Sequence, residues 1–487
     1  MFSIGIRPIL DKLAGQLGVD CVILAYLDDI YLLSKGPNTL DLVKEFFDEN
    51  DYSLKLNPNK SFITSIEEIK DSGLRVLGSC LGPTAIRKDF LEEKVALVEQ
   101  KINRLVDLPH QHALLLLRQC MQQDLRHLQR CLVSDDLIDV WKRLDQALWD
   151  GALRIRGARE QAGVDTSFID HRLLSLPVRH GGLGLLSHET CAPLAFAAAC
   201  DTSDHLLVAL LGEPAQQPLL LDANNADTIA PQRTRCNDAF NKQRDDLFTL
   251  LDDTQTKTII ESSSGLGKKW LSVVPFYQSL RLSDFEVSSA LHVRTLHTGS
   301  GAVCAGCGCN NFAGHAEVCT ERTRWNIARH EQVKRAIAAA LTKIEGVQVA
   351  VEPHIGNTAR RNDIRVTGSE ASGLASHEYD VTVVSLATRD SIATILPPGL
   401  HPTKSANRAH ALINKFLIFT SDKKRQRLPS NNIPFTPLVF SLGGMMDPGT
   451  IKALQIWQET VPPSVFASLC QQLSLILLRA KAKSFVL

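Results

Sequence analysis

The sequence lacks the marks of a secreted or membrane-spanning protein. In its 487 residues no apolar run reaches the roughly 18 residues that a membrane helix needs. The N-terminus, MFSIGIRPILDKL, has no basic start followed by a long apolar run, so no secretory signal is expected. An excess of charge is also absent, because 53 Lys and Arg balance 53 Asp and Glu. The overall charge therefore gives no support for nucleic-acid binding, which local basic patches would have to provide.

Cysteines are present but are not arranged as a disulfide framework. Of the 12 cysteines, eight are scattered and four crowd into residues 304–319. Scattered thiols in a long chain without a signal predict a reducing compartment. The length predicts two to four domains of about 100–200 residues each, and the apolar fraction of 44% is enough for sizeable cores.

Hydrophobic periodicity predicts a mostly helical middle and an α/β C-terminal part. One helical stripe has apolar residues at steps of three and four, namely Leu91, Val95, Val98, Ile102 and Leu105. Residues 177–184, PVRHGGLG, predict a turn, and the polar stretch 214–265 predicts a poorly packed connector. Near the C-terminus, three strand patterns, a helix, a fourth strand and two helices follow one another, which indicates an α/β layout.

Two adjacent aspartates interrupt an apolar stretch near the N-terminus. In VILAYLDDIYLL, residues 22–33, Asp28 and Asp29 separate two β-like runs, which predicts a hairpin with a carboxylate pair at its tip. Carboxylates between apolar strands are costly to bury, and a Mg²⁺ ion is a common reason for such a pair. The alternative is a solvated turn, in which Asp-Asp is frequent.

Cysteine and histidine gather with metal-binding spacing in CAGCGCNNFAGHAEVC. Cys304 and Cys307 lie on a Gly-containing turn, while His315 and Cys319 are spaced to share one face of a helical turn. Three thiolates and one imidazole predict a closed, structural Zn²⁺ site. Cys309 could take the place of Cys307, and the alternative to a metal site is a loop with free thiols.

A basic helix is predicted directly after the cysteine cluster. Its basic residues are Arg322, Arg324, Arg329, His330, Lys334 and Arg335. This cluster is the chain's best candidate for contacts with nucleic-acid phosphates. The alternative is a solvated charged face.

Two further aspartates begin neighbouring strand patterns. Asp363 starts DIRV and Asp380 starts DVTVV, so two antiparallel strands would bring their carboxylates to one end of a sheet. Such a pair can hold Mg²⁺ or Mn²⁺, and a nearby lysine can stabilise charge on a phosphate. That lysine usually stands two residues after the second acid, where this chain has Thr382, so Lys415 in ANRAHALINKF is the candidate. The alternative is ordinary surface residues.

The N-terminal third resembles the reverse transcriptase family. AYLDDIYLL resembles the Tyr-x-Asp-Asp motif of its palm, LKLNPNKS the following palm motif with Lys60 as its lysine, and RVLGSCLG the hairpin before the thumb. The resemblance implies that Asp28 and Asp29 bind Mg²⁺ for polymerisation. The family's further metal-binding aspartate stands on an earlier strand, which would lie before Met1. Residues 1–487 are therefore expected not to polymerise on their own.

The C-terminal half resembles non-LTR retrotransposon proteins with a restriction-like endonuclease. The cysteine cluster resembles their zinc knuckle, and Arg361-Asn362-Asp363, Asp380-Val381 and Lys415 resemble the nuclease motifs in order. Here Asn362 stands where the family has proline. The resemblance implies DNA and RNA as partners, a nuclear location and nicking of target DNA.

We therefore expect a multidomain chain of the α/β and α+β classes. The expected parts are a partial palm (1–85), a helical thumb (86–165), a helical connector with a polar linker (166–290), a CCHC zinc knuckle (291–322) and a restriction-endonuclease-like α/β domain (323–487). The predicted function is that of a reverse transcriptase fragment with a metal-dependent endonuclease. The alternative is a non-catalytic, zinc-dependent nucleic-acid-binding protein.

Overall fold

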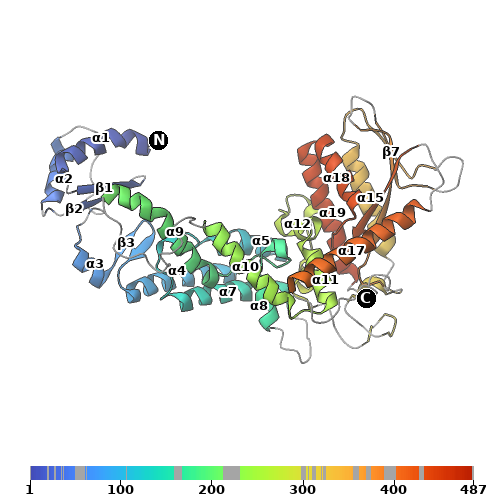
Figure 1. Ribbon diagram of the computed structural model, residues 1–487, viewed down its shortest axis with the longest axis horizontal. Helices are drawn as coiled ribbons and strands as arrows, with labels where there is room; N and C mark the ends of the chain where they lie inside the picture. The colour runs from blue at the N-terminus through green and yellow to red at the C-terminus, as the bar shows by residue number, and fades with distance from the viewer. Residues whose placement is uncertain are drawn as a thin grey trace. The chain divides into compact units, whose positions relative to one another are not determined.

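The structure is a computed structural model of the chain (Figure 1). The residues that it describes are 2–18, 21–26, 29–34, 36, 38–49, 61, 63–105, 107–157, 167–211, 231–297, 303–304, 306–309, 314–319, 321, 325–354, 361–368, 374–388, 402–426 and 433–484. Within these ranges it mixes helices and sheets. No described helix is both long and apolar enough to cross a membrane.

The chain forms two compact units, Met1–Ile86 and Arg87–Leu487, and each is described by itself. The finer division into five parts stays a prediction. In unit 1 the elements are α1 (Phe2–Leu17), β1 (Cys21–Tyr26), β2 (Asp29–Ser34), α2 (Thr39–Glu49), α3 (Ile66–Ser72), β3 (Leu74–Val76) and β4 (Ser79–Leu81).

Unit 1 contains the hairpin that the sequence predicts. β1 and β2 are antiparallel, with Cys21 opposite Ser34 and Tyr26 opposite Asp29. Helices α1 and α2 supply a small core of Leu13, Val43, Phe46 and Phe47, against which apolar residues of the hairpin pack. The stretch RVLGSCLG forms a second antiparallel hairpin, β3 and β4.

The first part of unit 2 is helical. Its elements are α4 (Thr84–Leu105, which begins in unit 1), α5 (His110–Gln119), η1 (Met121–Gln123), α6 (Leu128–Cys131), α7 (Ile138–Arg156), α8 (Ser167–Ser175), η2 (Val178–His180), α9 (His188–Leu211), α10 (Gln232–Phe248), α11 (Asp253–Ser263), α12 (Gly265–Lys269), η3 (Trp270–Ser272), η4 (Gln278–Leu280) and α13 (Asp284–Arg294). The apolar stripe predicted in α4 is confirmed, because all five of its residues are buried.

The prediction of a poorly packed connector is wrong for residues 232–263. These residues form α10 and α11, which bury Phe240, Leu247 and Ile259. Their apolar residues are few, but Phe240 and Leu247 are seven apart and so share one helical face. The mostly polar composition of these residues led us to overlook this narrow apolar stripe. Residues 212–230 of the predicted connector lie outside the described part of the chain.

The rest of unit 2 is an α/β layer structure. Its elements are α14 (His315–Val318), α15 (Trp325–Leu341), β5 (Gln348–Val351), β6 (Ile364–Thr367), β7 (His377–Val384), α17 (Pro402–Arg425), β8 (Phe435–Ser441), α18 (Pro448–Thr460) and α19 (Pro463–Ser484). The strands form one sheet in the order β5-β6-β7-β8. The predicted succession of three strands, a helix, a strand and two helices is confirmed.

Two of the strand pairings determine where Asp363 and Asp380 lie. β6 and β7 are antiparallel, with Ile364 opposite Tyr379, as the positions of Asp363 and Asp380 predict. β7 and β8 are parallel, with Asp380 opposite Pro437. Parallel neighbours need a crossover, and α17 provides it.

The sheet is covered on both faces. Tyr379 and Val381 of β7 join a core with residues of α15, α18 and α19. Alternate positions point to the other face, where Val384 and Val439 pack with residues of α17, α10 and α11. Asp380 therefore belongs to the face of β7 that α17 covers.

Candidate metal centre and acidic site

Residues 303–319 bring two short segments together around the cysteine cluster. The Cys304 N–H donates to the Cys309 carbonyl (2.8 Å), and the Gly308 N–H donates to the Cys304 carbonyl (2.8 Å). Gly308 has φ +72°, a left-handed conformation that this tight turn requires. In the second segment, α14 begins after Gly314 and ends at Val318, directly before Cys319.

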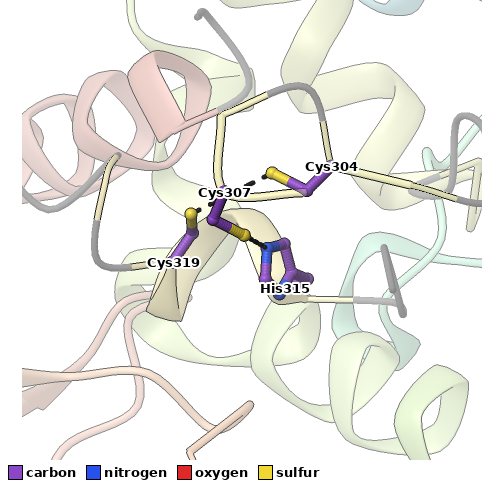
Figure 2. A group of neighbouring side chains, drawn as sticks. All are labelled: Cys304, Cys307, His315 and Cys319. Atoms are coloured by element: carbon purple, nitrogen blue, oxygen red, sulfur yellow. Dashed lines mark hydrogen bonds between the residues drawn. The ribbon is translucent and has the colours of Figure 1, made fainter. Parts of the chain in front are cut away.

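The four predicted ligands converge on one point (Figure 2). One ligand atom from each of Cys304, Cys307, His315 and Cys319 lies within 4.8 Å of all the others. The sulfurs of Cys304 and Cys319 are 4.0 Å apart, and Cys307 Sγ is 3.2 Å from His315 Nε2. Zn–S bonds of about 2.3 Å in a tetrahedral site separate two sulfurs by roughly 3.8 Å. The cluster therefore has the donor types and the spacing to hold zinc.

The surroundings of Cys304 favour the thiolate form of its side chain. Backbone N–H groups of Cys307 and Gly306 lower the pKa of the Cys304 thiol to about 6. Thiolates are the form in which cysteine binds metals. Cys309 is exposed and lies outside the cluster, so of the two cysteines that the sequence left open the structure brings Cys307 to the site.

Asp363 and Asp380 come from neighbouring strands. Asp363 directly precedes β6, and its N–H donates to the Tyr379 carbonyl of β7 (3.1 Å). Its carboxylate accepts a hydrogen bond from the Val381 N–H (2.6 Å). Because Tyr379 and Val381 flank Asp380, the antiparallel pairing brings the two acids side by side.

A histidine from α15 contacts the first acid. His330 Nε2 lies 3.0 Å from Asp363 Oδ2, and Asp363 is buried except for about 9% of its surface. The hydrogen bond that His330 donates to the Asp363 carboxylate raises the pKa of His330. We predicted His330 only as part of a basic surface; the structure places it in this acidic site.

A lysine from α17 contacts the second acid. Lys424 Nζ lies 2.6 Å from Asp380 Oδ2, and the Asp380 side chain is 17% exposed. Burial raises the pKa of Asp380, Lys424 lowers it, and the nearby charge of Asp363 raises it again. The two carboxylates therefore repel each other, and a positive charge beside them stabilises their ionised forms.

The structure brings Lys424, and not the predicted Lys415, into contact with Asp380. Lys415 is exposed, and the lysine that contacts Asp380 is Lys424, on the same helix. Nine residues at about 100° each turn the helix through two and a half revolutions, which places the two lysines on opposite faces. The signal that was missed is the Lys423-Lys424-Arg425 run in the last turn of α17.

The asparagine in the proline position has a structural role. Asn362 is buried, with 3% of its surface exposed. Its Nδ2 donates to Glu378 Oε2 on β7, and Glu378 also accepts from Arg365 Nε (2.6 Å). Asn362 thus fixes the segment before Asp363 to the strand that carries Asp380.

Only some of the described residues in the predicted phosphate-binding cluster lie on the surface. Arg322 and Arg324 lie outside the described residues. Lys334 is 2% exposed and pairs with Glu331 and Glu352 at 2.6 Å each. These two carboxylates neutralise its charge within the fold. Arg329 donates to the Val383 carbonyl (3.0 Å), and burial lowers its pKa. Arg335 alone among these described side chains projects far into solvent, 76% exposed, where it pairs with Glu331.

Of the aspartate pair in unit 1, the structure describes Asp29. Asp29 begins β2 opposite Tyr26 and is exposed. Asp28 and Lys60 lie outside the described residues. The hairpin is therefore present, while the metal-binding role of its carboxylates stays a prediction.

Comparison with family models and with curated proteins finds no match to the chain.

Proposed function

We propose that this chain derives from a retrotransposon protein and that residues 323–487 are a metal-dependent DNA endonuclease. The observation that supports this most is the pairing of Asp363 with Asp380 on antiparallel strands. Each acid meets one basic group from a different helix, His330 from α15 and Lys424 from α17. Two carboxylates, a lysine and a histidine are a set suited to phosphodiester hydrolysis.

The donor set fits a hard divalent cation. Oxygen ligands suit Mg²⁺ and Mn²⁺, and a cation between the two largely buried carboxylates would relieve their mutual repulsion. When bound at Asp363 and Asp380, such a cation would supply a water of lowered pKa as the attacking group.

The chain's own groups would orient and neutralise the reacting phosphate. Lys424 stands beside Asp380, where its ammonium can stabilise negative charge that develops on the phosphate oxygens. His330 holds the Asp363 carboxylate through a 3.0 Å hydrogen bond, and the Val381 N–H fixes the same oxygen from the strand. Hydrolysis adds water across one P–O bond, and the leaving oxygen takes up a proton.

The zinc cluster has a structural role in this proposal. Three thiols and one imidazole fill a tetrahedral shell and leave no position for substrate. The segment around it is short and rich in glycine, so it cannot build an apolar core of its own. Zinc would hold it together.

For the N-terminal third we propose descent from a reverse transcriptase palm and thumb. The support is the β1–β2 hairpin, with Asp29 at the start of β2, and the helices that follow. In this proposal the partners of the chain are DNA and RNA and its location is the nucleus. Residues 1–487 alone should show no RNA-templated DNA synthesis; primer extension that falls with Asp29→Ala would contradict this.

A zinc-dependent nucleic-acid-binding protein without catalysis is the second candidate. One observation favours it: both acids already have partners within the protein, since Lys424 pairs with Asp380 and His330 with Asp363. The carboxylates are thereby satisfied without a cation.

Nicking of plasmid DNA separates the two candidates. Zinc-loaded full chain should convert supercoiled plasmid to the open circular form with Mg²⁺ or Mn²⁺ and not with EDTA. Asp363→Ala and Asp380→Ala should abolish nearly all of this activity. Equal nicking by wild type and both variants would overturn the assignment, and folded wild type without nicking would favour the non-catalytic protein.

A further inference from the structure

Glu317 stands between two of the zinc ligands and is not one of them. It belongs to α14, with His315 before it and Cys319 after it. Its side chain is only 8% exposed. A buried carboxylate is costly unless it is paired and hydrogen-bonded, so its partners show what it does.

The first partner of Glu317 is a lysine from the last helix. Lys481 of α19 is 13% exposed and lies 3.0 Å from Glu317 Oε1. The same ammonium lies 3.5 Å from Glu261 Oε2 of α11, and Glu261 accepts a hydrogen bond from the Gly443 N–H (2.9 Å). Lys481 therefore links Glu317 of α14 to Glu261 of α11, and Glu261 in turn contacts Gly443, two residues after β8.

The second partner of Glu317 is the end of the strand that carries Asp380. Ser385 directly follows β7, and its hydroxyl donates to Glu317 Oε2. The Ser385 Oγ also accepts from the Ala387 N–H (3.1 Å). The Gly314 backbone also lies close to the Ala387 side chain, because a Cβ added at Gly314 would lie 2.6 Å from the Cβ of Ala387.

We infer that Glu317 is a positioning residue that couples zinc binding in the cluster to the end of β7. The inference rests on the zinc site proposed above. Helix α14 has four residues, too few to be stable by itself, so the ion that joins His315 to Cys319 sets its backbone. The position of the Glu317 carboxylate therefore depends on the ion. Without zinc, Ser385 loses a charge-assisted hydrogen bond and Lys481 loses one of its two acids.

Coupling of this kind is reciprocal. If zinc binding orders the Glu317–Ser385 contact, then loss of that contact must weaken zinc binding by the same factor. This consequence can be measured without any cleavage assay. It also separates a coupling role from a merely structural one, because the four ligands remain intact in the variants.

The test uses the full chain with Glu317→Gln, Ser385→Ala and Glu321→Gln. Glu321→Gln is the matched control, since it removes the same charge from an exposed position two residues after Cys319. Zinc affinity is measured by competition with a chelator. We expect Glu317→Gln and Ser385→Ala to bind zinc about 5–30-fold more weakly, within the usual range of coupling between sites. Glu321→Gln should stay within about twofold of wild type.

Hydrogen exchange of wild type with and without chelator gives the second readout. Zinc removal should speed exchange in the peptide covering 383–388, and Ser385→Ala should do so with zinc still bound. The peptide covering 91–105 in α4 should not change. Zinc affinity and exchange that are unchanged in Ser385→Ala would overturn the coupling while leaving zinc binding intact. A folded chain that takes up no zinc would overturn both proposals.

Discussion

Lys424 Nζ lies 2.6 Å from Asp380 Oδ2, although 44 residues separate the two along the chain. The crossover from β7 to β8 explains this pairing. Helix α17 packs over β8, and its last turn returns to the level of Asp380, so the lysine reaches the neighbouring strand. In this way a helix supplies the positive charge that Thr382 does not.

Removal of Lys424 tests this pairing. Lys424→Ala should slow DNA nicking by about 10²–10³, as loss of one charge-stabilising donor usually does. Lys415→Ala, on the opposite face of α17, should stay within about twofold of wild type. A larger loss in Lys415→Ala than in Lys424→Ala would return the role to Lys415.

Two cysteine variants test the zinc ligands. Cys307→Ser should lower zinc content well below the one ion per chain expected for wild type, because it removes one of four ligands. Cys309→Ser should keep the full zinc content, since Cys309 lies outside the cluster. Elemental analysis of the purified chains gives the answer, and loss of zinc in Cys309→Ser alone would reverse the assignment.

The buried lysine of α15 should matter for stability. Lys334→Ala leaves Glu331 and Glu352 without their shared partner, and we expect it to lower the free energy of unfolding by about 1–3 kcal/mol, since both acids are partly exposed to solvent. Arg335→Ala, at an exposed position, should cost less than about 0.5 kcal/mol. Urea denaturation measures both. A stable Lys334→Ala variant with weakened DNA binding would restore the phosphate-binding role.

Acid should destabilise the helical region through His188. This imidazole stacks on Trp141 and contacts Gln129, and burial lowers its pKa to about 4. The folded chain then binds fewer protons than the unfolded chain between pH 6.5 and 4, so stability is present above pH 6.5 and falls as the pH falls toward 4.

His188→Gln isolates this effect. Burial raises the pKa of Asp145 to about 6, so protonation of Asp145 stabilises the folded chain as the pH falls from 6 to 4. The pH dependence of wild type alone therefore does not report on His188. The advantage of wild type over His188→Gln should shrink by on the order of 1–3 kcal/mol from pH 7 to pH 4.5. Denaturation curves at both values that show a constant difference would contradict the assignment.

Sequence patterns were sufficient where local periodicity decides the structure. The strand that follows Asp363, the strand that contains Asp380, their antiparallel pairing and the spacing of the zinc ligands all follow from nearby residues. Each of these features depends on contacts within about 20 residues.

Contacts between distant segments could not be predicted from the sequence. The contact of Lys424 with Asp380 was missed because it depends on how α17 crosses the sheet, which no local pattern shows. Lys334 was mistaken for a surface residue because its burial depends on Glu352 beyond the end of the helix. The packing of the polar helix α10 was missed because its sequence does not show that three of its apolar side chains are buried.

Titration with Mn²⁺ tests the central claim that Asp363 and Asp380 form one cation site. Calorimetry on the zinc-loaded full chain should show binding of about one Mn²⁺ with wild type. Asp363→Ala and Asp380→Ala should each lose it, whereas Lys415→Ala should retain it. Binding of Mn²⁺ that is absent from folded wild type, or that persists unchanged in both aspartate variants, would contradict the account.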